Sequence, residues 1–340
     1  MTNQQATISN SATSRLSRNH LNDILQRVGL YEDLVRVEQE LIARIESQNE
    51  VLRAAATYTV QSGGKRLRVM LVLLAARLAN YQFDRAIHPA VAIELLHAAS
   101  LVHDDLVDHA DSRRGRATVH MTWDRDVALA LGDFLFGLAA RELAEEPDPR
   151  IIGFYVHAAR CMVEGELNPV TVVEPREQAE AQYFRKIGYK TAVLFEAACR
   201  SGIAVAGGSV AAVAALGQFG YELGLAFQII DDILDMVESE AVLGKPAGND
   251  LREGTITLPL ILAAAVNPSD VLRLAVAGNV PAERVSEVIA CIHSSGGIDA
   301  AYAVANDCVG RGLAYLAPFA TNDSFEAFAA IANHVIQRRQ

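Results

Sequence analysis

Two acidic runs with the same spacing constrain this chain more than any other feature of its sequence. They are Asp104-Asp105-Leu106-Val107-Asp108 and Asp231-Asp232-Ile233-Leu234-Asp235, and each ends a strongly apolar stretch. In a helix, the first and last aspartates of each run lie one turn apart on the same face. A single acidic helix end is often only a solvated surface. Two triplets, each ending a buried helix, predict instead that six carboxylates surround one cavity mouth.

So many carboxylates around one cavity need hard divalent cations, and Mg²⁺ is the natural one. Because Mg²⁺ keeps several waters and often shares its coordination with substrate phosphates, the two triplets predict a substrate that carries phosphate.

Clustered basic residues support the same interpretation. Gly63-Gly64-Lys65-Arg66-Leu67-Arg68 precedes the first triplet, and Arg113-Arg114-Gly115 follows it. We expect Lys65 and Arg68 to share one face of a helical turn. Together with the metal ligands, these cations predict two phosphate sites, one bridged by metal and one held directly by Arg and Lys.

The rest of the chain reads as helical. Apolar residues recur at helical spacing, and no strand alternation is convincing. We expect an all-α fold, a single-domain bundle of ten or more helices around a central cavity, over residues 21–340. The polar residues 1–20 are expected to form a disordered tail. Helices are predicted near 34–45, 69–79, 90–107, 127–143, 150–166, 179–206, 211–236 and 258–265, with about three more after residue 281.

Composition excludes other classes. The net charge of −11 disfavours a nucleic-acid-binding surface. Four scattered cysteines without a C-x-x-C pair indicate reduced thiols in a cytoplasmic protein. The N-terminus has no apolar secretory segment. The stretch 201–217 is too short for a membrane span and is broken by Gly207-Gly208, so we predict no span.

Taken together, these motifs resemble the trans-isoprenyl diphosphate synthases, or polyprenyl synthetases. The resemblance covers about residues 30–340 and rests on segments that occur in the family's order: 63–68, 94–115, Gly132-Asp133, Lys190-Thr191, 227–235 and 244–246. It implies an isoprenoid synthase fold and a Mg²⁺-dependent prenyltransferase that forms homodimers. Such an enzyme condenses isopentenyl diphosphate with an allylic diphosphate, head-to-tail and all-trans.

The resemblance also implies a role for particular residues. The six aspartates of the triplets would hold Mg²⁺: Asp104, Asp105, Asp108, Asp231, Asp232 and Asp235. The allylic diphosphate would meet Arg113, Lys190 and Lys245. Isopentenyl diphosphate would be held by Lys65, Arg68, His97 and Arg114. Thr191 and Gln228 would face the developing allylic cation. Considered alone, His97 would be a core histidine, and only the family context gives it this role.

One departure concerns the diphosphate site. Thr255 stands in Glu253-Gly254-Thr255, where the family usually has Lys, so one cation is missing. The segment 118–120 also departs from the family pattern, and we have no interpretation for it. Neither departure touches the metal ligands, so we expect activity.

Product length follows from the residues that precede Asp104. Ala99 and Ser100 lie about one helical turn before it and Leu96 one turn further, and the first two are small. In the family, a bulky aromatic residue here stops chain growth early. A turn rises about 5.4 Å, close to one isoprene unit, so we predict geranylgeranyl diphosphate or a polyprenyl diphosphate of roughly six to ten units. Ala99→Phe should shorten it.

Three alternatives compete. A class I terpene cyclase shares the fold, but its second metal motif differs. A non-catalytic or partner-dependent subunit of a heteromeric synthase would tend to lose the triplets. A helical scaffold would leave the carboxylates unexplained. For the homodimer, the apolar stretches 69–79 and 127–143 are the candidate surfaces.

Overall fold

The computed structural model describes residues 23–237, 248–278, 280–322 and 324–338. The predicted tail over 1–20 and the segment that carries Lys245 lie outside these residues.

The first half contains α2 (Leu30–Arg44), α3 (Glu50–Gln61), α4 (Leu67–Arg77), α5 (Phe83–Val107), α6 (Val119–Thr122), α7 (Arg125–Ala144) and α8 (Pro149–Glu166). The second half contains α9 (Arg176–Ile187), η1 (Gly188–Ala192), α10 (Val193–Val205), α11 (Val210–Val237), α13 (Asn249–Arg252), α14 (Leu258–Val266), α15 (Asp270–Val276), η2 (Ala282–Arg284), α16 (Val285–Ser294), α17 (Gly297–Tyr315), η3 (Ala317–Phe319) and α18 (Ser324–Ile336).

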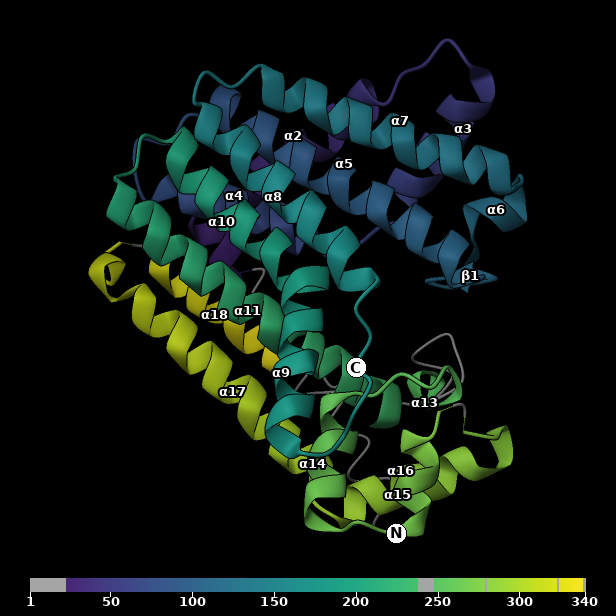
Figure 1. The fold of residues 1–340 in the computed structure, drawn as a ribbon. Helices are drawn as coiled ribbons and strands as arrows, with labels where there is room; N and C mark the ends of the chain where they lie inside the picture. The colour runs from purple at the N-terminus through teal and green to yellow at the C-terminus, as the bar shows by residue number, and fades with distance from the viewer. Residues whose placement is uncertain (1–22, 238–247, 279, 323, 339–340) are drawn as a thin grey trace, which may run out of the picture.

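Two long helices, α5 and α11, carry the acidic triplets at their C-terminal ends. Helix α5 packs against α4, α7 and α10, and α11 packs against α10, α17 and α18. Figure 1 shows α5 and α7 side by side at the top of the molecule and α17 along the edge of α11. Helices α13, α15 and α16 lie at the lower right, across from the end of α5, and α14 packs between this group and α9 and α17. The predicted all-α architecture is confirmed.

Local signals set the helix ends. Asp124 begins α7 by accepting a hydrogen bond from the Val127 amide at 2.7 Å, and Asp148 begins α8, which has Pro149 in its first turn. Gly207, at φ 78°, separates α10 from α11. The stretch 201–217 therefore contains the end of α10, a short turn and the start of α11.

Several expectations need correction. The stretch 179–206 is three consecutive segments, because the π-helix η1 lies between α9 and α10. Within the described residues there is one small β-hairpin, β1 (Ser112–Arg113) with β2 (Arg116–Ala117), where no strand was predicted. Helices α3, α13 and α15 were not predicted. Helix α4 is buried almost completely, so the stretch 69–79 is core and offers no surface to a second subunit.

Two helices meet the length and apolarity expected of a membrane span. These are α5 and α11, and the bent pair Ala282–Ser294 and Gly297–Tyr315 would add a third if it were one span. In the fold both α5 and α11 are central packing helices. That the chain has no span stays a prediction.

Candidate active site

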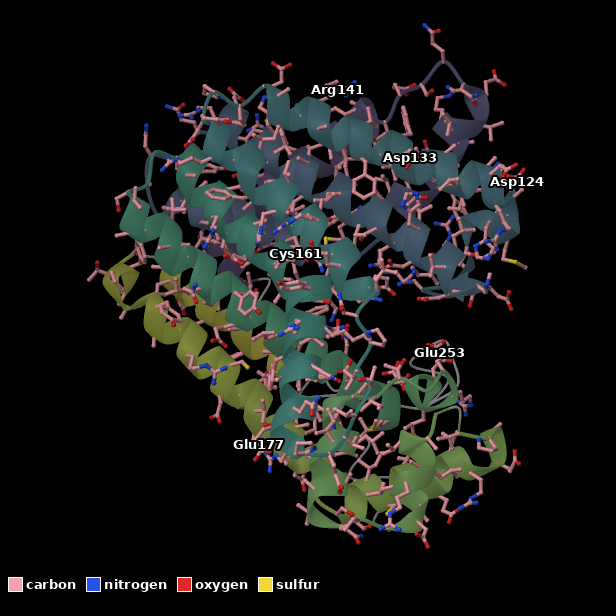
Figure 2. All side chains as sticks on the ribbon, in the orientation of Figure 1. Asp124, Asp133, Arg141, Cys161, Glu177 and Glu253 are labelled. Atoms are coloured by element: carbon pink, nitrogen blue, oxygen red, sulfur yellow. The ribbon has the colours of Figure 1, made fainter. Side chains whose placement is uncertain are left out.

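The ends of α5 and α11 face a common cavity of about 480 Å³. Asp108 from the first triplet and Asp232 from the second both line it. The wall across from α5 comes from α13 and the residues after it, where Glu253 is labelled in Figure 2. The prediction that the fold brings the two triplets to one cavity is confirmed for this pair of aspartates.

The aspartates of the first triplet lie in different electrostatic surroundings. Asp105 is buried and accepts a hydrogen bond from Arg113 Nε at 2.7 Å, whereas Asp108 is exposed. Burial raises the pKa of Asp104 to about 6; Lys190 opposes this rise, and Glu166 and Asp108 add to it. Ionising Asp104 in this environment is unfavourable without a counterion, so a bound cation would stabilise its carboxylate.

The second triplet is held by a hydrogen-bond network. Asp232 accepts from Tyr183 Oη at 2.6 Å and from Gln228 Nε2 at 2.9 Å, while the Thr191 hydroxyl donates to Gln228 Oε1 at 2.7 Å. Burial raises the pKa of Asp232 to about 6, although both donors oppose the rise. The network links two predicted catalytic residues, Thr191 and Gln228, to a predicted metal ligand.

The other two aspartates of this triplet have different surroundings. Asp235 is buried and accepts a hydrogen bond from the Asp250 amide at 3.1 Å. Asp231 forms an ion pair with Arg338 at 3.0 Å, and the Arg338 guanidinium lies over the Phe227 ring at 4.4 Å. The end of the described chain therefore contacts the second triplet.

Tyr183 was not predicted, and we expect it to orient Asp232. Tyr183→Phe should weaken Mg²⁺ affinity or turnover by about 10- to 100-fold, the usual effect of losing a hydrogen bond to a metal ligand. Steady-state kinetics against Mg²⁺ concentration would measure this. A matched control is Tyr155→Phe, because Tyr155 is also buried and donates to the Pro89 carbonyl at 2.6 Å, outside the cavity wall. Equal kinetics in the two variants would contradict the role.

Lys190 and Thr191 lie on the π-helix η1, a form often found at functional sites. Neighbouring helices approach η1 where they lack a side chain. A Cβ on Gly165 would lie 2.8 Å from Lys190 N, and one on Gly224 would lie 2.5 Å from Ala192 Cα. Next to Gly165, Glu166 pairs with Lys190 Nζ at 2.5 Å. Close packing from α8 and α11 thus fixes η1 at the cavity.

A second cluster contains the cations predicted for the other diphosphate. Arg68 stacks over the Phe195 ring at 4.5 Å, and burial lowers its pKa to about 10. Burial holds the pKa of His97 well below its usual range, and the charges of Arg68 and Arg114 lower it further. His97 is therefore neutral among cations. Arg114 lies against Gly64, where a Cβ would be 3.0 Å from its guanidinium.

The expected register at Lys65 is wrong. Helix α4 begins at Leu67, so Lys65 precedes the helix and lies 3.5 Å from His334 Nε2 of α18. Arg66 adopts φ 48° at the helix N-terminus and pairs with Glu38 and Glu94. The pair with Glu94 is buried and Glu38 is partly exposed, and together they hold the Arg66 side chain while its backbone takes the left-handed conformation.

The carboxylates suit a metal ion that is shared with substrate. Among the described residues, no three His, Cys, Asp or Glu side chains form a ready-made metal cluster. Carboxylates instead reach one cavity from two helices, next to cations that suit phosphate. Mg²⁺ commonly binds one or two carboxylates and completes its shell with water and phosphate oxygens, so the donor set fits it.

Sequence reasoning missed four groups at or near the cavity: Tyr183, Glu166, Lys186 and Arg338. None stands in a recognisable motif, and each is brought to the site by tertiary packing. His103, just before the first triplet, has a packing role, because its imidazole fills the space left by Gly132 and its Nε2 lies 3.2 Å from the Leu129 carbonyl.

Known proteins provide an independent comparison. The family described as "Polyprenyl synthetase" matches residues 49–293. Component 2 of the heptaprenyl diphosphate synthase of Geobacillus stearothermophilus is 36% identical over 309 residues, 91% of this chain and 97% of that protein. The octaprenyl diphosphate synthase of Haemophilus influenzae is 36% identical over 270 residues, 78% and 82% of the two chains. A crystal structure of polyprenyl synthase from Caulobacter crescentus, complexed with calcium and isoprenyl diphosphate, has a TM-score of 0.87 at 34% identity and covers 94% and 98%.

Proposed function

Because the chain belongs to the polyprenyl synthetase family and is a prenyltransferase, we propose that it works with Mg²⁺ in the cavity between α5 and α11. The enzyme condenses isopentenyl diphosphate with an allylic diphosphate and releases diphosphate, which gives geranylgeranyl diphosphate or a longer chain. One observation carries the proposed site: Asp108 and Asp232, from distant triplets, line the same cavity as Arg113 and Lys190.

In this proposal the triplets hold the metal, with Asp104 and Asp108 on one side and Asp231 and Asp232 on the other. Bound Mg²⁺ would supply electrostatic stabilisation of the diphosphate leaving group. The remaining aspartates, Asp105 and Asp235, support the site through their contacts with Arg113 and the Asp250 backbone.

The protein's own cations then act on the two substrates. Arg113, Lys190 and Lys245 would bind the allylic diphosphate and stabilise charge as it departs. Arg68 and Arg114 would bind isopentenyl diphosphate, with Lys65 at the edge of this site. His97, being neutral, would donate one N–H to that diphosphate and leave the positive charge to the arginines.

Thr191 and Gln228 would face the allylic cation. Since Gln228 donates its amide to Asp232 and accepts from Thr191, its orientation is fixed before substrate arrives. Fixed oxygen dipoles stabilise a cation without reorganising during the reaction. The alkene of isopentenyl diphosphate attacks that cation, and a proton is then lost.

The testing experiment is an elongation assay. The protein is incubated with isopentenyl diphosphate and, separately, dimethylallyl, geranyl, farnesyl and geranylgeranyl diphosphates, with and without Mg²⁺. Products longer than the primer, formed only with Mg²⁺ and sized by mass spectrometry, are expected. A cyclic hydrocarbon from one primer would indicate a cyclase, and no product from folded protein would indicate a partner-dependent subunit.

We propose a homodimer formed through α7 and α8. Their outer faces expose large apolar residues: Leu129 is 53% exposed, Val156 61% and Val163 60%. Figure 2 shows Asp124, Asp133 and Arg141 spaced along α7. Analytical ultracentrifugation should give a dimer for the wild type and a monomer for Val156→Asp/Val163→Asp. An unchanged mass in that variant would exclude this interface, and a monomeric wild type would favour a heteromeric assembly.

Two broader proposals follow. Cys161, Cys199 and Cys308 are buried and all four cysteines are free thiols, which supports a cytoplasmic location. We also propose that residues 21–340 form one domain, since the helices of both halves contribute to one cavity.

A further inference from the structure

One lysine in the cavity wall has no role in the function proposed above. Lys186 is in the last turn of α9, four residues before Lys190. It is half-buried, and both lysines line the cavity that Asp108 and Asp232 share. The ammonium groups of Lys186 and Lys190 therefore lie on the same wall of one cavity.

The cations of the cavity differ in how far their charge is already neutralised. Arg113 is paired with Asp105 at 2.7 Å and Lys190 with Glu166 at 2.5 Å. Arg114 lies against Gly64, in the cluster of cations that contains the neutral His97. In the part of the chain that the structure describes, Lys186 forms no ion pair within 4.0 Å. An arriving diphosphate would meet an unpaired ammonium at Lys186, whereas it must compete with Glu166 for Lys190.

The charge of Lys186 reaches the second triplet. It is one of the influences that lower the pKa of Asp232, against the stronger effect of burial. The lysine side chain is flexible and binds phosphate as a point charge. The Lys186 ammonium near Asp232 therefore suits a phosphate ligand that bridges the two triplets.

Among the described residues 249–257, none that lines the facing wall is basic. The described residues that line it between 249 and 257 are Asn249, Asp250, Glu253, Thr255, Ile256 and Thr257. The Thr257 hydroxyl is buried without a hydrogen-bond partner. Thr255 stands where the family usually has Lys, and no basic side chain of residues 249–257 replaces that lysine in the cavity.

We propose that Lys186 binds the diphosphate of the allylic substrate and stabilises it as it leaves, supplying from α9 the charge that Thr255 does not supply. This inference rests on the proposed function and adds to its diphosphate site a residue that the acidic and basic motifs did not indicate.

The test is Lys186→Met, which removes the charge and keeps the length of the side chain. We expect kcat/KM for the allylic diphosphate to fall about 10- to 100-fold, the value of one charge-assisted hydrogen bond, and KM for isopentenyl diphosphate to stay within about twofold. Thr255→Lys added to this variant should restore most of the loss, because it returns a cation to the same cavity from the other wall.

Two controls separate this effect from general electrostatics and from misfolding. Arg185→Met removes the same charge from the exposed neighbouring residue, which does not line the cavity, and should leave kinetics unchanged. Thermal unfolding followed by circular dichroism should give similar curves for all variants. Lys186→Arg should keep most of the activity.

A second readout does not depend on turnover. Calorimetric titration with inorganic diphosphate in Mg²⁺ buffer should show affinity about tenfold or more weaker in Lys186→Met. If the wild type fails to elongate any primer, the proposed function is wrong, and this titration still decides the role of Lys186. Wild-type binding and kinetics in Lys186→Met, or no rescue by Thr255→Lys, would overturn the inference while leaving the proposed function standing.

Discussion

Asp104→Asn is expected to abolish nearly all elongation and, at the same time, to stabilise the metal-free protein at neutral pH. Loss of a metal ligand should remove several kcal/mol of leaving-group stabilisation, so turnover should fall by about 10² to 10⁴-fold. The stability effect has the opposite sign because Asp104 is half-buried, and this burial, with the charges of Glu166 and Asp108, raises its pKa to about 6. An amide carries no charge to be desolvated.

The pH dependence of this stability difference can be worked out. A carboxyl whose pKa is raised by folding stabilises the native state below its unfolded pKa of about 4, and this contribution is lost as pH rises through about 6. Relative to wild type, Asp104→Asn should therefore gain on the order of 2 kcal/mol in unfolding free energy above pH 6 and nothing below pH 4.

Denaturant unfolding in EDTA at several pH values would measure this difference, with elongation assayed in parallel. Asp299→Asn is a suitable control, because Asp299 is exposed on α17 and does not line the cavity. Retention of more than a tenth of wild-type turnover would show that Asp104 is not an essential ligand. A stability difference that does not vary with pH would contradict the raised pKa.

The second large effect is expected at Ser100, where an aromatic residue should truncate the product. Ser100 is half-buried, and its hydroxyl donates to the His97 carbonyl at 2.9 Å. It lies one turn before Asp104, so a Phe side chain there would project toward the path of the growing chain. The longest product of Ser100→Phe should be shorter by at least roughly one isoprene unit.

Ala99 adds a stability cost to the same test. It is 0% exposed, so Ala99→Phe, which is also expected to shorten the product, should overpack the core and reduce stability by about 1–3 kcal/mol. Mass spectrometry of products, with melting curves for Ser100→Phe, Ala99→Phe and Ser100→Ala, would separate the two positions. Unchanged product length in Ser100→Phe would place the floor of the chain-binding path on another helix.

Strong helical patterns and repeated motifs were enough to predict most of the fold. Residues 83–107 and 210–237 are apolar enough to identify their helices and acidic enough at their ends to identify the site. Helix α3 was missed although it is amphipathic, because its buried face consists of small residues, Ala55, Ala56 and Val60, among Thr and Tyr. The hairpin at 112–117 is too short to show alternation.

What the sequence could not predict depends on contacts between distant segments. Lys65 leaves the helix because two glutamates from α2 and α5 hold Arg66 in a left-handed conformation. Tyr183 acquires its role only when α9 packs beside α11. A periodic pattern also cannot tell Ala99 from Ser100, since both face inward and only the packing of neighbouring helices buries one of them.

The π-helix at residues 188–192 has a consequence for how this sequence can change over generations. A π turn accommodates one residue more than an α-helical turn, so the run from α9 through α10 carries the equivalent of a single inserted residue. Deleting one residue there would let the turn close as an ordinary α-helical turn, with α9 and α10 keeping about the same relative orientation. The residues of the turn itself would shift, so Lys190 and Thr191 would not both keep their contacts with Glu166 and Gln228. The helix would tolerate such a deletion and the site would lose these contacts, so the placement of Lys190 and Thr191, and not folding, is what keeps the extra residue in place.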